Sequence, residues 1–153
     1  MREALESYCA ARAAERISER QLDELSGILK KSATLVDKVR SSGKAVADKG
    51  VAKKFHSLDL AFHMTIIEAS RNRRMLKVVG DSHILSRIFQ ADRHEFNLDI
   101  LETTQKEHES IARAIAAQET TASHDAMKKH IRNSLDLTLS ETDNDISDRW
   151  WTE

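Results

Sequence analysis

The stretch Leu58-Asp59-Leu60-Ala61-Phe62-His63 places a carboxylate and an imidazole four residues apart in a segment with helical periodicity. Side chains at this spacing lie above one another on one helix face, roughly 5–6 Å apart at Cβ, so that both can bind one cation. Apolar residues recur on the same face at helical spacing, namely Phe55, Leu58, Phe62, Ile66 and Ala69. A carboxylate directed at a core must be paired, hydrogen-bonded or bound to a metal. The sequence therefore predicts that the fold brings a neutralising partner to Asp59.

The composition of the whole chain favours helix. Its 153 residues include no proline and only four glycines, and 32% of them are charged with a net charge of −1. This length predicts one domain, and the composition predicts an all-α fold. The balanced charge does not indicate a nucleic-acid-binding surface. The single cysteine, Cys9, excludes an internal disulfide, and neither a signal peptide nor an apolar run of membrane-spanning length is present, so we expect a cytoplasmic protein.

We expect an antiparallel bundle of about six helices joined by short turns. The expected helices span residues 1–17, 18–42, 52–70, 72–93, 97–118 and 120–142, and they form the domain 1–142 with an acidic tail, 143–153, behind it. Side chains suited to cap these helices are Ser18 with Gln21 in a capping box, Asn72 (which also suits a left-handed stop), Asn97 or Asp99, and Thr120 or Thr121. Residues 43–50 are expected to form a loop or a frayed helix end.

Two of the expected helices carry polar residues next to an apolar side. In the first helix, Leu5 and Cys9 lie on the apolar side, with Arg2 and Glu6 beside them. In the fourth helix, the apolar side includes Met75, Val78, Leu85, Ile88 and Phe89. A polar line on the fourth helix forms either the wall of a ligand pocket or a solvated face, and it consists of His83, Arg87, Gln90 and His94.

Four polar residues fall within the apolar stripes of three different helices: Asp59, His63, His108 and His130. Helical bundles build metal sites from facing helices in this way, and imidazole with carboxylate suits zinc, nickel, manganese or iron(II). The alternative is a buried Asp–His hydrogen-bond network without a metal. A single histidine in an apolar stripe would favour the second interpretation, whereas the set of four favours a metal.

Four segments spread over nearly the whole chain resemble the FCD domain, the C-terminal effector-sensing domain of the FadR subfamily of GntR-type transcriptional regulators. They are residues 2–6 (REALE) with 10–15, residues 59–63 (DLAFH) ending in 68–72 (EASRN), residues 107–115 (EHESIARAI), and residues 126–131 (AMKKHI). The sequence departs from the family pattern at Arg71, where the family usually has glycine. The winged helix-turn-helix that precedes the FCD domain in the family has no counterpart in this sequence, and we expect DNA binding only through such a separate domain.

The resemblance implies a metal site and an effector. The family's ligands, one aspartate and three histidines, correspond to Asp59, His63, His108 and His130, which would bind one divalent ion, with zinc or nickel expected before manganese or iron. A small carboxylate or sugar acid would complete the coordination. We expect the effector to contact Arg87 first, Arg2 second, and Asn133 as a further polar group. The family also implies a homodimer.

Two other classes of function remain open from the residues alone. A metal-dependent enzyme would also keep open coordination positions, although the inward stripes offer no evident additional glutamate as a general base. A structural or dimerisation module would have lost its metal, and the intact set of four ligand-type residues argues against it. We therefore expect a sensing domain without catalytic residues.

Overall fold

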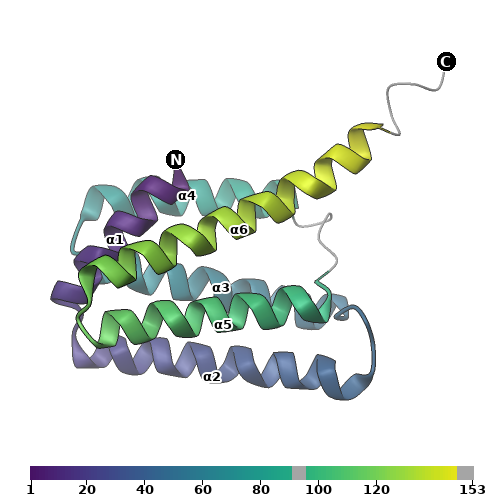
Figure 1. Ribbon diagram of the computed structural model, residues 1–153, viewed down its shortest axis with the longest axis horizontal. Coiled ribbons are helices and arrows are strands. Elements are labelled where there is room, and N and C mark those ends of the chain that lie inside the picture. The colour runs from purple at the N-terminus through teal and green to yellow at the C-terminus, as the bar shows by residue number, and fades with distance from the viewer. Residues whose placement is uncertain (91–95, 148–153) are drawn as a thin grey trace.

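The computed structural model describes the backbone of residues 1–90 and 96–147, and the side chains of residues 1–81 and 96–134. This described part forms six α-helices, which confirms the predicted all-α bundle (Figure 1). The helices are α1 (Arg2–Arg16), α2 (Glu19–Ser42), α3 (Lys49–Ala69), α4 (Arg73–Gln90), α5 (Leu98–Ala116) and α6 (Thr120–Ser147). None of the helices in the described ranges is long and apolar enough to cross a membrane.

The helix ends follow local side-chain chemistry at several predicted positions. Ser18 and Gln21 form the predicted capping box at the start of α2. Asn97 caps α5, its side chain accepting a hydrogen bond of 2.9 Å from the backbone N–H of Ile100. Asn72 accepts hydrogen bonds from the backbone of Arg74 and Met75, so of its two predicted roles it takes that of the N-cap of α4.

Two helix boundaries differ from the sequence prediction by three residues or more, and one predicted cap is not formed. Helix α3 begins at Lys49 rather than near residue 52, because the Asp48 side chain accepts a hydrogen bond of 2.8 Å from the backbone N–H of Val51 and caps the helix earlier. Helix α6 begins at Thr120, as predicted, so Thr120 and Thr121 both lie inside the helix and neither caps it. The same helix continues to Ser147, beyond the predicted end at residue 142. Residues 91–93, predicted as the end of α4, lie outside the described residues.

The turn between α3 and α4 shows why glycine would suit the position of Arg71. Arg71 has φ of 57°, a left-handed conformation that residues with a side chain adopt at a cost of roughly 1–2 kcal/mol. Glycine adopts this conformation without that cost, which is the physical reason for the family's usual glycine at this position.

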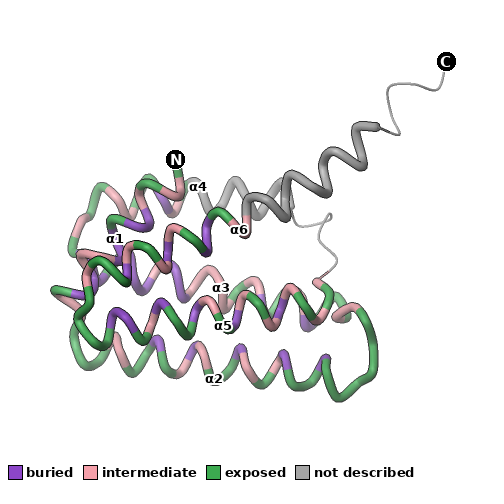
Figure 2. Tube along the Cα trace, viewed as in Figure 1, coloured by how far each residue is buried: buried purple, intermediate pink, exposed green. Residues whose placement is uncertain are grey.

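The largest core cluster lies between α1, α2, α3, α5 and α6. Helix α5 packs between α2 and α6, while α1 packs against both α6 and α3. Buried positions recur along α1, α3, α5 and the described part of α6 (Figure 2). The buried members of the cluster are Ala10, Ala13, Leu25, Ile28, Phe62, Ile66, Ala69, Ile111, Ile115, Met127 and Ile131. Cys9 is fully buried, beside Ile67 and Val79.

Helix α4 differs in register from the prediction. Val78, predicted on the apolar side, is 44% exposed, whereas its neighbour Val79 is fully buried against Cys9 and Ile67. One step along a helix turns the side chain by about 100°, so an error of one residue moves a valine from the core to the surface. The side chains of Leu85, Ile88 and Phe89 lie outside the described part.

Candidate metal centre

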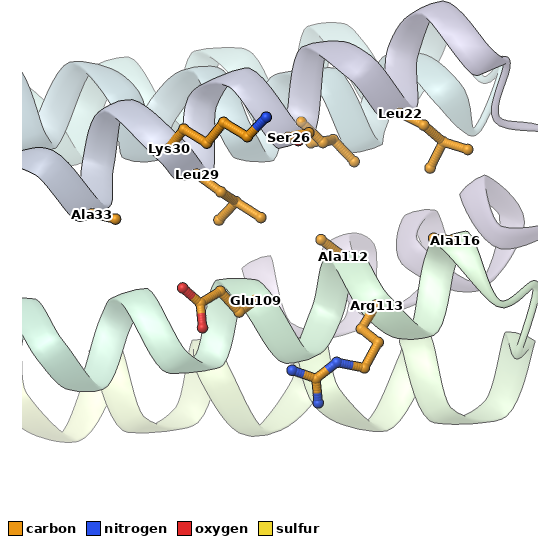
Figure 3. A pocket seen from close by; sticks show the side chains of 10 residues that line it. Leu22, Ser26, Leu29, Lys30, Ala33, Glu109, Ala112, Arg113 and Ala116 are labelled. Carbon is orange, nitrogen blue, oxygen red and sulfur yellow. The ribbon is translucent and has the colours of Figure 1, made fainter.

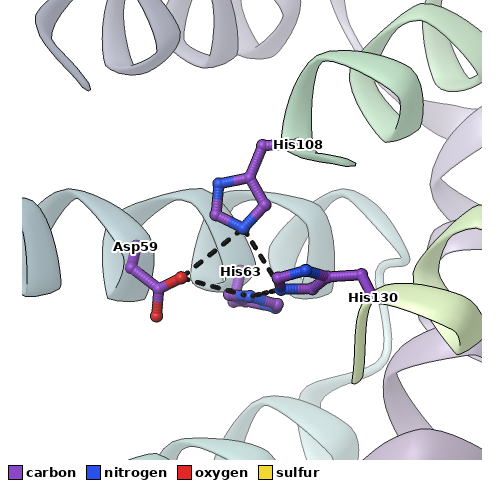
Figure 4. A group of neighbouring side chains, drawn as sticks. All are labelled: Asp59, His63, His108 and His130. Carbon is purple, nitrogen blue, oxygen red and sulfur yellow. Dashed lines mark hydrogen bonds and ion pairs between the residues drawn. The ribbon is translucent and has the colours of Figure 1, made fainter. Parts of the chain in front are cut away.

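The four predicted ligand residues converge in the interior of the bundle. Helix α3 contributes Asp59 and His63, α5 contributes His108 and α6 contributes His130 (Figure 4). One side-chain nitrogen or oxygen from each residue lies within 4.8 Å of the corresponding atoms of the other three. The three histidines are buried, and the side chain of Asp59 is 22% exposed. The site is therefore closed on the histidine side and reaches solvent at Asp59.

The distances between these atoms suit a single cation. Nε2 of His130 lies 3.2 Å from Nε2 of His63 and 3.2 Å from Nε2 of His108. Oδ1 of Asp59 lies 3.5 Å from Nε2 of His108 and 3.8 Å from Nε2 of His63. Two ligand atoms that each lie about 2.1 Å from one metal ion are separated by about 3.0–3.4 Å at the usual coordination angles. Three of these four separations lie in or close to this range.

Two glutamates contact the Nδ1 atoms of two of the histidines, whose Nε2 atoms face the cluster. Oε2 of Glu6, on α1, lies 2.6 Å from Nδ1 of His63. Oε2 of Glu107, on α5, lies 2.7 Å from Nδ1 of His130. Metal-binding histidines typically direct their second nitrogen at a carboxylate or carbonyl in this way. Neither glutamate was assigned a role from the sequence, where Glu6 stands only beside an apolar helix face.

These glutamates bear on both interpretations of the cluster, the metal site and the metal-free network. An ionised carboxylate only accepts hydrogen bonds, so Nδ1 carries the proton of each neutral imidazole. Nε2 of His63 and Nε2 of His130 then present lone pairs to each other at 3.2 Å. Two neutral imidazoles in this form cannot hydrogen-bond to each other through Nε2, whereas a cation between them would bind both lone pairs. The arrangement favours a metal site over a metal-free network.

The protonation states support cation binding. Burial, opposed by the nearby Glu6 carboxylate, lowers the pKa of His63. Burial and the neighbouring His130 hold the pKa of His108 well below its ordinary value. Burial alone would raise the pKa of the Asp59 carboxyl, but the facing histidines keep that pKa below its ordinary value. Neutral imidazoles and an ionised carboxylate are the forms that bind metals.

An aromatic contact orients the third histidine. The ring of His108 stacks on Phe62, with centroids 4.1 Å apart and an interplanar angle of 14°. Phe62 also contacts His63 edge to face, at a centroid distance of 5.8 Å. Phe62 is fully buried, so it fixes two ligand rings from within the core.

The predicted effector contacts lie at different distances from this centre. Nε of Arg2 donates a hydrogen bond of 2.7 Å to Glu6, and the side-chain amide of Asn133 donates one to Glu107. Both residues thus contact the glutamates that hold the ligand histidines. Arg87 lies on α4, and its side chain is outside the described residues, as are those of His83 and Gln90 and the whole of His94. Contact of any of them with an effector stays a prediction.

A groove with a volume of about 440 Å³ lies between α2 and the side of α5 that carries Glu109, Ala112 and Arg113 (Figure 3). It is lined mainly by apolar atoms, with charged side chains among them. The residues that line it are Leu22, Leu25, Ser26, Leu29, Lys30, Ala33, Glu109, Ala112, Arg113 and Ala116. No groove was predicted on this side from the sequence.

Comparisons with known proteins agree with this fold. The family model of the FCD domain matches residues 1–133. The structure of E. coli McbR/YncC is similar to this chain with a TM-score of 0.70 and 14% sequence identity, over 92% of this chain and 65% of that chain. The chain thus spans about 65% of the length of that structure, and at this identity the likeness concerns the fold alone. No curated protein sequence gives a significant match.

Proposed function

Because the chain belongs to the FCD-domain family, we propose that it is the ligand-sensing domain of a GntR-type transcriptional regulator of the FadR subfamily. In this proposal it binds one divalent metal ion through Asp59, His63, His108 and His130, and a small carboxylate at the remaining coordination positions. The observation that carries the proposal is the convergence of four ligand atoms from three helices within 4.8 Å.

The donor set is compatible with the four metals expected from the sequence. Three imidazole nitrogens and one carboxylate oxygen suit zinc or nickel, and also manganese or iron(II). When bound, the ion supplies positive charge that attracts an anionic oxygen. The protein residues hold the imidazoles in place: the Glu6 and Glu107 carboxylates lie 2.6 and 2.7 Å from the Nδ1 atoms of His63 and His130, and Phe62 stacks on His108.

The effector class follows from the open positions and from the exposed edge of the site. A six-coordinate ion held by four protein atoms has two positions left, which the two oxygens of a carboxylate or sugar acid can fill. Asp59 is the one ligand with a partly exposed side chain, which supports approach of the effector from its side. Arg87, Arg2 and Asn133 are the proposed additional contacts of the effector.

The proposed sensor acts together with a DNA-binding domain. Family membership supports a regulatory role without catalysis, and the enzyme hypothesis differs by predicting turnover of the bound acid. We expect the domain to form a homodimer, because regulators of this kind match two half-sites with two-fold symmetry. The domain alone should show no operator-specific retention in a gel shift, because its basic residues are interleaved with acidic ones (24 Lys and Arg against 25 Asp and Glu).

Metal analysis of purified variants tests the centre. We expect about one divalent ion per chain, lost in both Asp59→Ala and His108→Ala, because each variant removes a ligand. His124→Ala is the matched control, since His124 is an exposed histidine on α6 whose Nδ1 lies 2.9 Å from Asp125. Full metal occupancy in either ligand variant would refute the assignment.

A melting screen of the metal-loaded protein against organic and sugar acids tests the effector. A ligand at about 100 times its dissociation constant adds roughly 2.7 kcal/mol of stability, or an increase in Tm of about 5–10 °C for a domain of this size. The shift should disappear in Asp59→Ala. A broad panel without any shift would contradict the carboxylate sensor, and turnover of an acid that binds would favour the enzyme hypothesis.

A further inference from the structure

Helix α1 supplies none of the four ligands, yet it sends a buried carboxylate to the centre. Glu6 is 1% exposed, and its carboxylate lies between the Arg2 guanidinium and the His63 imidazole. Its Oε1 accepts from Nε of Arg2 at 2.7 Å, and its Oε2 lies 2.6 Å from Nδ1 of His63. The three side chains form a continuous path from the first turn of α1 to a ligand on α3.

Burying this carboxylate costs free energy that a structural role alone does not explain. Charged groups in a core lose their hydration, and apolar residues of similar volume often replace buried ion pairs without loss of stability. Leu5 and Cys9 on the same helix belong to an apolar cluster, whereas the Glu6 side chain contacts Arg2 and His63. Glu6 does something that an apolar residue cannot do, because it fixes which nitrogen of His63 carries the proton.

We propose that Glu6 is a positioning residue that orients His63 for the cation and couples α1 to occupancy of the site. This inference rests on the proposed function. With Nδ1–H held by Glu6, the lone pair of His63 is on Nε2, directed at His130 and Asp59. Without a cation, the facing lone pairs repel; with one, His63 is held and the Glu6 contact is strengthened. Since coupling is reciprocal, the cation stabilises the docking of α1 as much as docked α1 stabilises cation binding.

A comparison with Glu107 shows how α1 differs from the helices that supply ligand residues. Glu107 performs the same task for His130, but it stands on α5, which itself contributes the neighbouring ligand His108. The loss of Glu107 would loosen one imidazole while α5 stayed bound to the ion. The loss of Glu6 would release α1 from the ion. The state of the centre is thus communicated to the first helix of the domain, through Glu6.

The test compares Glu6→Gln with Glu3→Gln in titrations with Co²⁺ and Zn²⁺. In Glu6→Gln, the new side-chain amide presents its NH₂ group either to Arg2 or to Nδ1–H of His63, so one donor faces another. Glu3 is the matched control: it lies on α1 and pairs with an arginine (Arg132 Nε at 3.0 Å) on the surface. We expect roughly a 10- to 100-fold weaker affinity for Glu6→Gln, as for other outer partners of metal ligands, and no change for Glu3→Gln. Equal affinities in the two variants would overturn the proposal.

Hydrogen exchange tests the coupling to α1. In the wild type and in Glu3→Gln, saturating Co²⁺ should slow exchange of the amides of α1 as well as those of α3, α5 and α6. In Glu6→Gln at saturation, protection of α3, α5 and α6 should persist while the added protection of α1 is lost. Equal protection of α1 in Glu6→Gln and the wild type would refute the coupling.

A measurement on the wild type tests the proposal even if Glu6→Gln fails to fold. Nitrogen-15 NMR of the metal-free wild type should show His63 and His130 as Nδ1–H tautomers, a property that a merely structural Glu6 would leave unspecified. An Nε2–H tautomer at His63 would overturn the proposal. If the wild type binds neither ion, the proposed metal site itself fails, which separates that outcome from a failure of the Glu6 inference.

Discussion

Two sides of α5 present opposite arrangements of polar and apolar groups. One side carries His108 into the core, where four polar atoms from three helices converge within 4.8 Å (Figure 4). Another side carries Glu109, Ala112 and Arg113 to the groove against α2, which has a volume of about 440 Å³ and is mainly apolar (Figure 3). In the groove, the charged ends belong to Lys30, Glu109 and Arg113, and they stand among apolar lining residues.

The difference shows that the candidate metal site is identified by converging metal-ligand atoms and not by the volume of a groove. Buried nitrogen and oxygen atoms whose lone pairs point at one another favour a bound cation between them, because buried polar atoms without partners cost free energy. An apolar groove open to water requires no ligand for stability. We therefore expect substitutions on the two sides of α5 to differ sharply in their effect on metal binding.

The largest expected effect is that of Phe62→Ala. Truncation of a fully buried phenylalanine typically costs about 3–5 kcal/mol of stability, and here it also removes the stack on His108. The groove counterpart is Leu29→Ala, which should cost less because Leu29 is only partly buried. Chemical denaturation of both variants with and without metal measures the difference. Metal affinity that survived in a folded Phe62→Ala protein would show that the stack does not orient His108.

Removal of the metal is expected to have the next largest effect. At about 100 times the dissociation constant, the ion contributes roughly 2.7 kcal/mol, so a chelator should lower the Tm by about 5–10 °C. The same treatment should leave the Tm of His130→Ala unchanged, because that variant has no ion to lose. Scanning calorimetry with the chelator and with added Zn²⁺ measures both. An equal chelator effect on the two proteins would contradict the site.

Two glutamates only two residues apart on α5 give a sharper comparison. Glu107→Gln should weaken metal binding by roughly 10- to 100-fold, because one donor of the amide must face Nδ1–H of His130 or the amide of Asn133. Glu109→Gln should leave the affinity unchanged, since Glu109 accepts a hydrogen bond of 2.7 Å from Gln105 and lines the groove. Calorimetric titration with Zn²⁺ separates the two. Similar losses of Zn²⁺ affinity in both variants would mean that the affinity depends on the net charge of α5 and not on the contact between Glu107 and His130.

The smallest effect is expected for Arg113→Ala in the groove. Surface substitutions of this kind usually change stability by less than about 0.5 kcal/mol, and Arg113 contacts no member of the metal centre among the interactions described above. Its metal content, metal affinity and Tm should match those of the wild type. A loss of metal in this variant would connect the groove to the centre and break the contrast between the two sides.

The sequence by itself determined the local features of this protein. Helical periodicity put Asp59 and His63 on one inward face, and the same rule identified His108 and His130 on two other helices. The capping box of Ser18 and Gln21 was also predictable, because caps depend on residues three apart. These predictions succeeded because the geometry of a single helix fixes which residues share a face.

Only the tertiary structure decided which residues of different helices meet. Glu6 lies 57 positions before His63, and their contact depends on how α1 crosses α3. Glu107 meets His130 only because α5 and α6 pack side by side, and the exposure of Val78 in place of Val79 depends on the rotation of α4. Spacing along a helix determines its faces, but the packing of side chains between helices sets their rotation and register. The ligand types of the centre were therefore determined within single helices, and its connection to α1 arose from their packing.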